Sequence, residues 1–117
     1  MRDHLTSPQW WENAWRRHYQ KYVSRPAFQA YYLYSVLPHG VSDLLEIGAG
    51  SFRDAAKLNQ WGLKCIGTDF STKAVELARQ TYSRWADNFH VCDATRLPFA
   101  SQSFDVSFHN GLFACFQ

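Results

Sequence analysis

Two glycines and one acid stand where they could hold a polar or nucleotide-like ligand. Gly48 and Gly50 form a short turn after the apolar run at residues 43–47, and Glu46 precedes the first glycine by two residues. Glycine adopts positive φ and lets a ligand approach the backbone, while free N–H groups at a helix start favour anionic or polar groups. We therefore expect this turn to form one wall of a ligand site.

Two further acids follow the next two apolar runs. Asp69 stands 21 residues after Gly48, where a carboxylate can accept hydrogen bonds from both hydroxyls of a ribose, and Asp93 follows residues 89–92. Open α/β sheets bind ligands at the carboxyl ends of their strands, so these acids and Glu46 would line one crevice. The alternatives are an ordinary strand-to-helix turn for the glycines and helix or turn capping for the aspartates.

The elements that must position these residues alternate along the chain after Gly40. Strands of this kind joined by helices form right-handed βαβ units and a parallel sheet. The pattern predicts a doubly wound α/β fold with about four strands. Strands are expected at residues 43–47, 63–68, 89–92 and 104–108, and helices at residues 53–61 and 72–85, the latter capped by Ser71.

An aromatic-rich helical segment precedes this sheet. Aromatic side chains recur at spacings of four and three from Trp11 to Tyr22, which indicates one face of a helix beginning at Pro8. Arg25-Pro26 ends it, because the residue before proline disfavours helical backbone, and a second helix is expected at residues 28–37. We expect both helices to pack on the sheet or to cover the ligand cleft; a surface that stacks nucleic-acid bases is the alternative.

Composition limits the class of protein. The 117 residues, 46% of them apolar, suffice for one compact unit, with residues 1–40 as a helical lid or extension and residues 41–117 as the sheet domain. The formal charge of +2 is scattered and predicts no nucleic-acid or membrane partner. No apolar run nears the roughly 20 residues of a membrane span, and no secretory leader is evident, so a cytoplasmic location is expected. Three cysteines without CxxC spacing indicate no metal site.

In combination, these segments resemble the class I S-adenosylmethionine-dependent methyltransferases of the small-molecule type. The resemblance covers about residues 43–116 and implies a Rossmann-like fold. Besides the glycine turn and the two aspartates, it depends on three segments near the end of the chain: Arg96-Leu97-Pro98-Phe99, Ser103-Phe104-Asp105-Val106 and His109-Asn110-Gly111-Leu112.

The resemblance implies S-adenosylmethionine as cofactor and a place for each of its parts. The methionine part and the sulfonium would lie against Glu46, Gly48 and Gly50. Asp69 would hold the ribose, and Asp93 would face the adenine amino group. The other residues expected at the cofactor are Ala49, Phe70, Ala94, Asn110, Tyr22 and Arg25.

The resemblance identifies residues that hold the cofactor, but we assign no catalytic residue. Methyl transfer from a sulfonium is a direct displacement that mainly requires alignment, and so does not need a dedicated catalyst. His109 and Asn110 are the candidates to orient or deprotonate an acceptor, which we expect to be a small molecule; a polar residue that merely ends a strand is the alternative for His109.

Two departures from the family pattern are apparent. The family usually has a third glycine where Phe52 stands, so we expect this side chain to narrow the site. The family sheet has seven strands, so the chain resembles a form truncated after strand four, whose bare edge at residues 104–108 favours self-association.

Two alternative functions follow. One is a shortened, non-catalytic module that binds S-adenosylmethionine or associates with itself. The other is a fragment of an NAD-dependent oxidoreductase, against which Arg53 occupies the third glycine position of the dinucleotide fingerprint.

Overall fold

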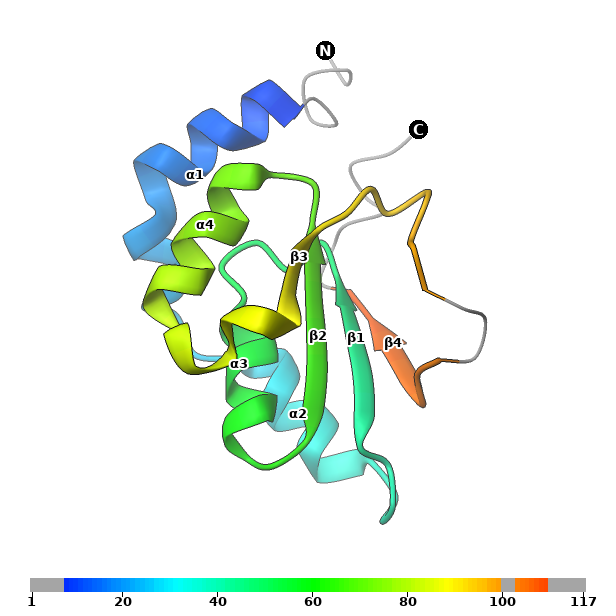
Figure 1. The fold of residues 1–117 in the computed structure, drawn as a ribbon. Coiled ribbons are helices and arrows are strands. Elements are labelled where there is room, and N and C mark those ends of the chain that lie inside the picture. The colour runs from blue at the N-terminus through cyan, green and yellow to red at the C-terminus, as the bar shows by residue number, and fades with distance from the viewer. Residues whose placement is uncertain (1–7, 100–102, 110–117) are drawn as a thin grey trace.

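The computed structural model describes residues 8–99 and 103–109, which form a parallel sheet and its helices (Figure 1). The helices are α1 (Pro8–Val23), α2 (Phe28–Val36), α3 (Arg53–Gln60) and α4 (Thr72–Thr81), followed by the 3₁₀ helix η2 (Ser83–Asn88). The strands are β1 (Asp43–Ile47), β2 (Lys64–Asp69), β3 (Phe89–Val91) and β4 (Val106–Phe108). The predicted order of elements is confirmed.

The four strands are all parallel and lie in the order β3-β2-β1-β4. Asp43 pairs with Lys64 at the start of β1, and Glu46 pairs with Gly67 and with Phe108 near its end. β1 and β2 are therefore the central strands, and their carboxyl ends lie side by side (Figure 1). The predicted α/β, Rossmann-like architecture is confirmed.

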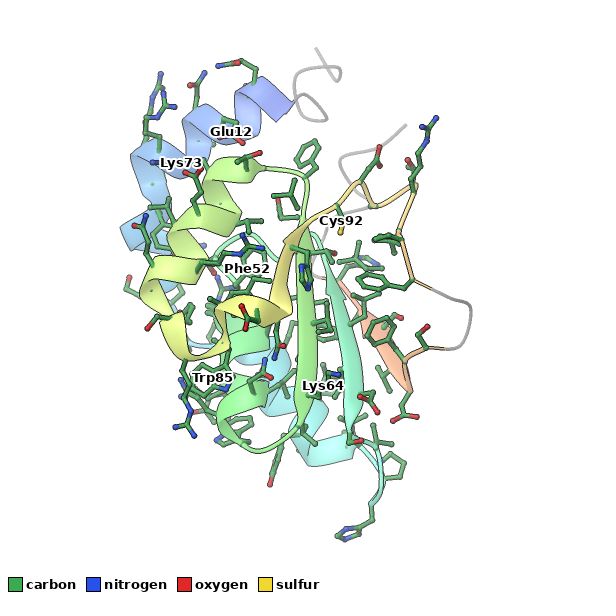
Figure 2. The ribbon with its side chains drawn as sticks, in the orientation of Figure 1. Glu12, Phe52, Lys64, Lys73, Trp85 and Cys92 are labelled. Atoms are coloured by element: carbon green, nitrogen blue, oxygen red, sulfur yellow. The ribbon has the colours of Figure 1, made fainter. Side chains whose placement is uncertain are left out.

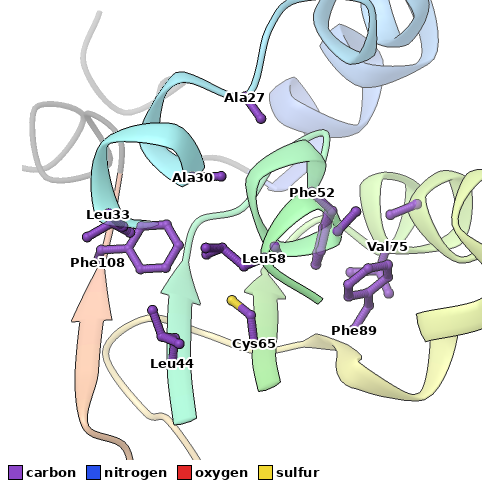
Figure 3. Close-up of a cluster of buried hydrophobic side chains, with 13 residues drawn as sticks. Ala27, Ala30, Leu33, Leu44, Phe52, Leu58, Cys65, Val75, Phe89 and Phe108 are labelled. Carbon is purple, nitrogen blue, oxygen red and sulfur yellow. The ribbon is translucent and has the colours of Figure 1, made fainter. Parts of the chain in front are cut away.

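One hydrophobic core joins the sheet to the helices. Each strand contributes one buried side chain to it, namely Leu44, Cys65, Phe89 and Phe108. Residues of α2, α3 and α4 cover these side chains, and Figure 3 shows the helices on the same side of the strands as the cluster. Alternate strand residues point to one face, so every second position of β1 faces this helix layer. Glu46, two residues after Leu44, is consequently buried beneath the start of α3.

The long helix predicted after Ser71 is divided. Ser71 caps it as expected, because its hydroxyl accepts a hydrogen bond from the backbone N–H of Ala74 at 3.1 Å. α4 nevertheless ends at Thr81, since Tyr82 leaves helical backbone at φ −118° and directs its ring edge-on toward Phe89. The continuous helix at residues 72–85 was therefore wrong beyond Thr81, where packing against the sheet outweighs local helix propensity.

The N-terminal helix packs on α4. Tyr19 is buried, and its hydroxyl donates to Oγ1 of Thr81 at 3.0 Å. The side chains of the other aromatic residues in the predicted stripe lie outside the described part of the chain, namely Trp11, Trp15 and Tyr22. None of the helices that the structure describes is long and apolar enough to cross a membrane.

Candidate functional site

The glycine turn carries the chain from β1 to α3 across the end of β2. Gly48 and Gly50 have φ angles of 66° and 60°, a backbone conformation that other L-residues rarely adopt. The N–H of Ala49, between them, donates to the backbone oxygen of Thr68 at 2.8 Å. The turn is thus held against the carboxyl end of β2, as the sequence pattern predicts.

Asp69 connects this turn to the start of the next helix. Its Oδ2 accepts a hydrogen bond from the N–H of Gly50 at 2.9 Å, and its Oδ1 accepts one from the N–H of Ser71 at 3.0 Å. The N–H of Phe70 also donates to this carboxylate. The side chain is buried, and desolvation raises its pKa despite these hydrogen bonds. A carboxylate has about four lone-pair sites, so the group can accept a further hydrogen bond from a ligand.

Glu46 places a carboxyl group directly below the turn. The N–H of Ala55 donates to it, while Oε1 has no hydrogen-bond partner among the described residues. Burial, followed by the nearby charge of Asp54, raises the pKa of Glu46 well above its ordinary value of 4.5. A buried acceptor atom without a partner suits a ligand that brings a donor or a positive charge to it.

Asp93 occupies a turn just beyond β3. The N–H of Cys92 donates to the backbone oxygen of Asp69 at 2.9 Å, which brings the ends of β2 and β3 together. The carboxylate of Asp93 is exposed and accepts hydrogen bonds from the hydroxyl and the N–H of Thr95, at 2.6 and 2.8 Å. These two bonds lower its pKa. Asp93 thus caps a turn, which was the alternative considered from the sequence.

The structure places the remaining predicted residues in different parts of the molecule. Phe70 and Ala94 are half-buried next to Asp69 and Asp93, respectively. Arg25 instead lines a cavity of the helix layer, and His109 is exposed after the end of β4. Asn110 and the side chain of Tyr22 lie outside the described residues. The structure therefore brings together Glu46, Gly48, Ala49, Gly50 and Asp69.

Phe52 does not narrow this site. It caps α3 in left-handed backbone at φ 62°, and its fully buried ring belongs to the hydrophobic core (Figure 3). The ring lies 4.8 Å from that of Phe89, measured between centroids. The expectation that its side chain narrows the ligand site is wrong, because the ring points into the sheet–helix interface.

Glu12 is a residue of this region that the sequence analysis missed. Its Oε1 accepts hydrogen bonds from the hydroxyl of Ser71 and the N–H of Lys73, both at 3.0 Å, so α1 reaches the start of α4 (Figure 2). Its charge contributes to raising the pKa of Asp69. Glu12 stands seven residues before Tyr19, on the same helical face, and this spacing is the signal that could have identified it.

Within residues 8–99 and 103–109, no group of three or more histidine, cysteine, aspartate or glutamate side chains is arranged to hold a metal ion. The polar atoms at the strand ends suit an organic ligand with hydroxyl and amino groups.

The strand order and the glycine turn define a Rossmann-like domain of the class I methyltransferase type. A family described as "Methyltransferase domain" matches residues 45–117, which is more than half of the chain, and the chain belongs to this family. The resemblance seen in the sequence is thereby confirmed, and S-adenosylmethionine is the cofactor of this family. No curated protein gives a significant match.

Two solved structures have the same fold. Phosphoethanolamine N-methyltransferase 1 from Haemonchus contortus, in complex with phosphoethanolamine and S-adenosylhomocysteine, is 20% identical with a TM-score of 0.57 over 88% of this chain. The plantazolicin methyltransferase BpumL, in complex with S-adenosylhomocysteine, is 25% identical with a TM-score of 0.52 over 89% of this chain. The chain spans 26% and 41% of these two proteins, less than half of either.

Proposed function

We propose that this chain binds S-adenosylmethionine and forms the cofactor-binding part of a methyltransferase acting on a small-molecule acceptor. The observation that carries this proposal is the double contact of Asp69, which accepts from Gly50 and from Ser71 at the carboxyl ends of the central strands. The carboxylate of Asp69, the glycine turn and the start of α4 therefore lie next to one another. Together they suit the ribose and methionine parts of the cofactor.

The residues present fit this cofactor. Glu46 offers a buried, unpartnered oxygen below the turn, suited to the positively charged methionine part. Asp69 would hold the ribose hydroxyls, while Gly48, Ala49 and Gly50 let the ligand approach the backbone. Asp93, Ala94 and Phe70 would surround the adenine, and Tyr22 and Asn110 complete the proposed set, whereas Arg25 lines a cavity of the helix layer.

The chemistry of the reaction needs little from the chain beyond alignment. When bound, S-adenosylmethionine supplies a methyl group on a sulfonium. The residues of this chain hold the cofactor and orient it, and a small-molecule acceptor would approach from the carboxyl ends of the strands. His109 and Asn110 remain the proposed residues for orienting or deprotonating this acceptor. Of residues 1–40, α1, whose Glu12 reaches the start of α4, would cover the site as a lid.

Several properties of the protein are part of the same proposal. We place it in the cytoplasm, with no nucleic-acid or membrane partner. β4 is an edge strand, paired with β1 alone among the described strands, and self-association through this edge is the second candidate property. A chain that binds the cofactor as a dimer but transfers no methyl group would be the non-catalytic module considered above.

Calorimetric titration with S-adenosylmethionine and with S-adenosylhomocysteine tests the proposal. We expect micromolar binding of both, weakened about tenfold or more by Asp69→Asn, because a hydrogen bond to a charged group contributes about 1.5–3 kcal/mol. Asp87→Asn is the matched control, since Asp87 is an exposed acid of η2. Unfolding curves confirm that each variant is folded.

Either of two results would contradict the proposal. One is a folded chain that binds neither compound. The other is displacement of the bound product by NAD(H), which would favour the oxidoreductase alternative.

A further inference from the structure

A polar cavity lies in the helix layer, away from the strand ends. Its volume is about 260 Å³, and it is bounded by the α1–α2 turn, α2, α3 and the residue that ends α4. Positively charged side chains line it from two elements, namely Arg25, Arg53 and Lys57. Tyr31, Gln60 and Tyr82 add hydroxyl and amide groups. No acidic residue is among the described residues that line it.

Two of these three cations lie on one face of α3 because of helical spacing. Arg53 and Lys57 are four residues apart on α3, and Ala56 between them has a side chain small enough to leave space. Like charges at this spacing repel each other and destabilise a helix. An anion bound between them would remove this repulsion.

Arg53 is held in position at the wall of the cavity. Its Nε donates to the backbone oxygen of Pro26 at 3.2 Å, and its Nη1 donates to the hydroxyl of Ser51 at 3.1 Å. The nearest acid along α3, Asp54, is buried and accepts from the N–H of Ala30 at 3.0 Å. Its carboxylate therefore caps α2, and its charge also acts on Arg53 and on Tyr82 at the wall of the cavity.

The hydroxyl of Tyr82 remains a hydrogen-bond donor at neutral pH. Burial raises the pKa of this side chain to about 12. The lining thus combines guanidinium, ammonium, hydroxyl and amide donors, which is the set of groups that proteins use for phosphate.

We propose that this cavity binds a soluble phosphate-type anion, either inorganic phosphate or the phosphate group of a small phosphorylated molecule. Its volume lies slightly below the roughly 300–1,000 Å³ of pockets for drug-sized ligands, which suits a small anion. Arg53 stands beside the glycine turn, but Ala56, Lys57 and Gln60 follow it along α3, so most of the cavity lies apart from the proposed cofactor site. Arg25, assigned to the cofactor by resemblance, serves this anion site instead.

Calorimetric titration with inorganic phosphate and with pyrophosphate tests this inference, at constant ionic strength maintained with chloride. The expected result is saturable binding that Lys57→Gln and Arg25→Gln each weaken about tenfold or more, since both remove a charged donor from the anion. Lys64→Gln is the matched control, because Lys64 is an exposed lysine at the amino end of β2, outside the cavity (Figure 2). This control should bind phosphate like the unaltered chain.

Repeating the titration with saturating S-adenosylhomocysteine separates this inference from the proposed function. Phosphate affinity should not change, and a chain that fails to bind the product should still bind phosphate. The inference is overturned if the product abolishes phosphate binding, if Lys64→Gln weakens it as much as Lys57→Gln, or if no saturable binding occurs. Unfolding curves without phosphate show whether each variant is folded. If Lys57→Gln does not fold, Arg25→Gln, at an exposed position, provides a second test.

Discussion

The ring of Phe52 lies directly against the backbone of Gly67. A Cβ atom at position 67 would be 2.6 Å from Cδ2 and 2.8 Å from Cε2 of this ring, closer than such atoms approach each other in proteins. Gly67 is in β2, opposite Phe89 of β3, and the rings of Phe52 and Phe89 are in contact. The ring of Phe52 thus packs the start of α3 against the sheet, and the glycine at position 67 of β2 leaves the space for it.

Gly67→Ala should destabilise the chain by about 1–3 kcal/mol, the usual cost of forcing extra atoms into a packed core. The ring of Phe52 is fully buried and in contact with Phe89, so it can move only if its neighbours move with it. Urea unfolding measures the loss. In a Phe52→Leu background the same substitution should cost clearly less, and an equal cost in both backgrounds would show that the two residues do not interact.

Phe52→Gly should lower stability without improving cofactor binding. Loss of the buried ring outweighs the relief of the left-handed backbone, and we expect a net loss of about 2–4 kcal/mol. Calorimetric affinity for S-adenosylhomocysteine, measured where the variant is folded, should stay within about threefold of the unaltered chain, a difference below 1 kcal/mol. A large gain in affinity would mean that the ring does obstruct the site.

The buried carboxyl group of Glu46 should make stability depend on pH. Because burial raises its pKa in the folded chain, the folded state retains a proton that the unfolded state has already released above about pH 4.5. The folded state binds more protons in this range, so its stability falls as pH rises toward the raised pKa. Glu46→Gln cannot titrate, and its stability relative to the unaltered chain should increase as pH rises.

Urea unfolding between pH 5 and pH 8 measures this difference. Glu76→Gln is the control, because Glu76 is an exposed glutamate of α4 and should leave the pH profile unchanged. Parallel profiles for Glu46→Gln and the unaltered chain would show that Glu46 does not retain its proton in the folded state.

Asp54→Ala should loosen the start of α2. The N-cap residue Ala27 makes no side-chain hydrogen bond, and Asp54 supplies this cap from α3 by accepting from the N–H of Ala30. Its removal should cost about 1–3 kcal/mol, while Asp54→Asn, which keeps an acceptor, should cost less. Faster hydrogen exchange at the amide of Ala30 would locate the effect, and exchange at Ala30 that does not change would contradict it.

The sequence by itself determined the order of the strands and of the α-helices between them, and the family. The alternation of apolar runs with helical patterns predicted the parallel sheet, and β1 at residues 43–47 is observed where it was expected. The spacing from Gly48 to Asp69 predicted that the glycine turn and this acid meet. These features depend on the periodicity of apolar residues and on the general geometry of parallel strands. Both can be inferred from residues that lie close together in the sequence.

Only the tertiary structure decided where particular side chains point. Phe52 occupies a position that usually belongs to a glycine, yet its ring is in the core because Gly67, in the next strand, leaves space for it. Asp54 caps a helix that begins 26 residues earlier in the chain, and Glu12 of α1 reaches the start of α4. Such contacts join residues far apart in sequence, so they depend on how helices pack on the sheet, which no local pattern encodes.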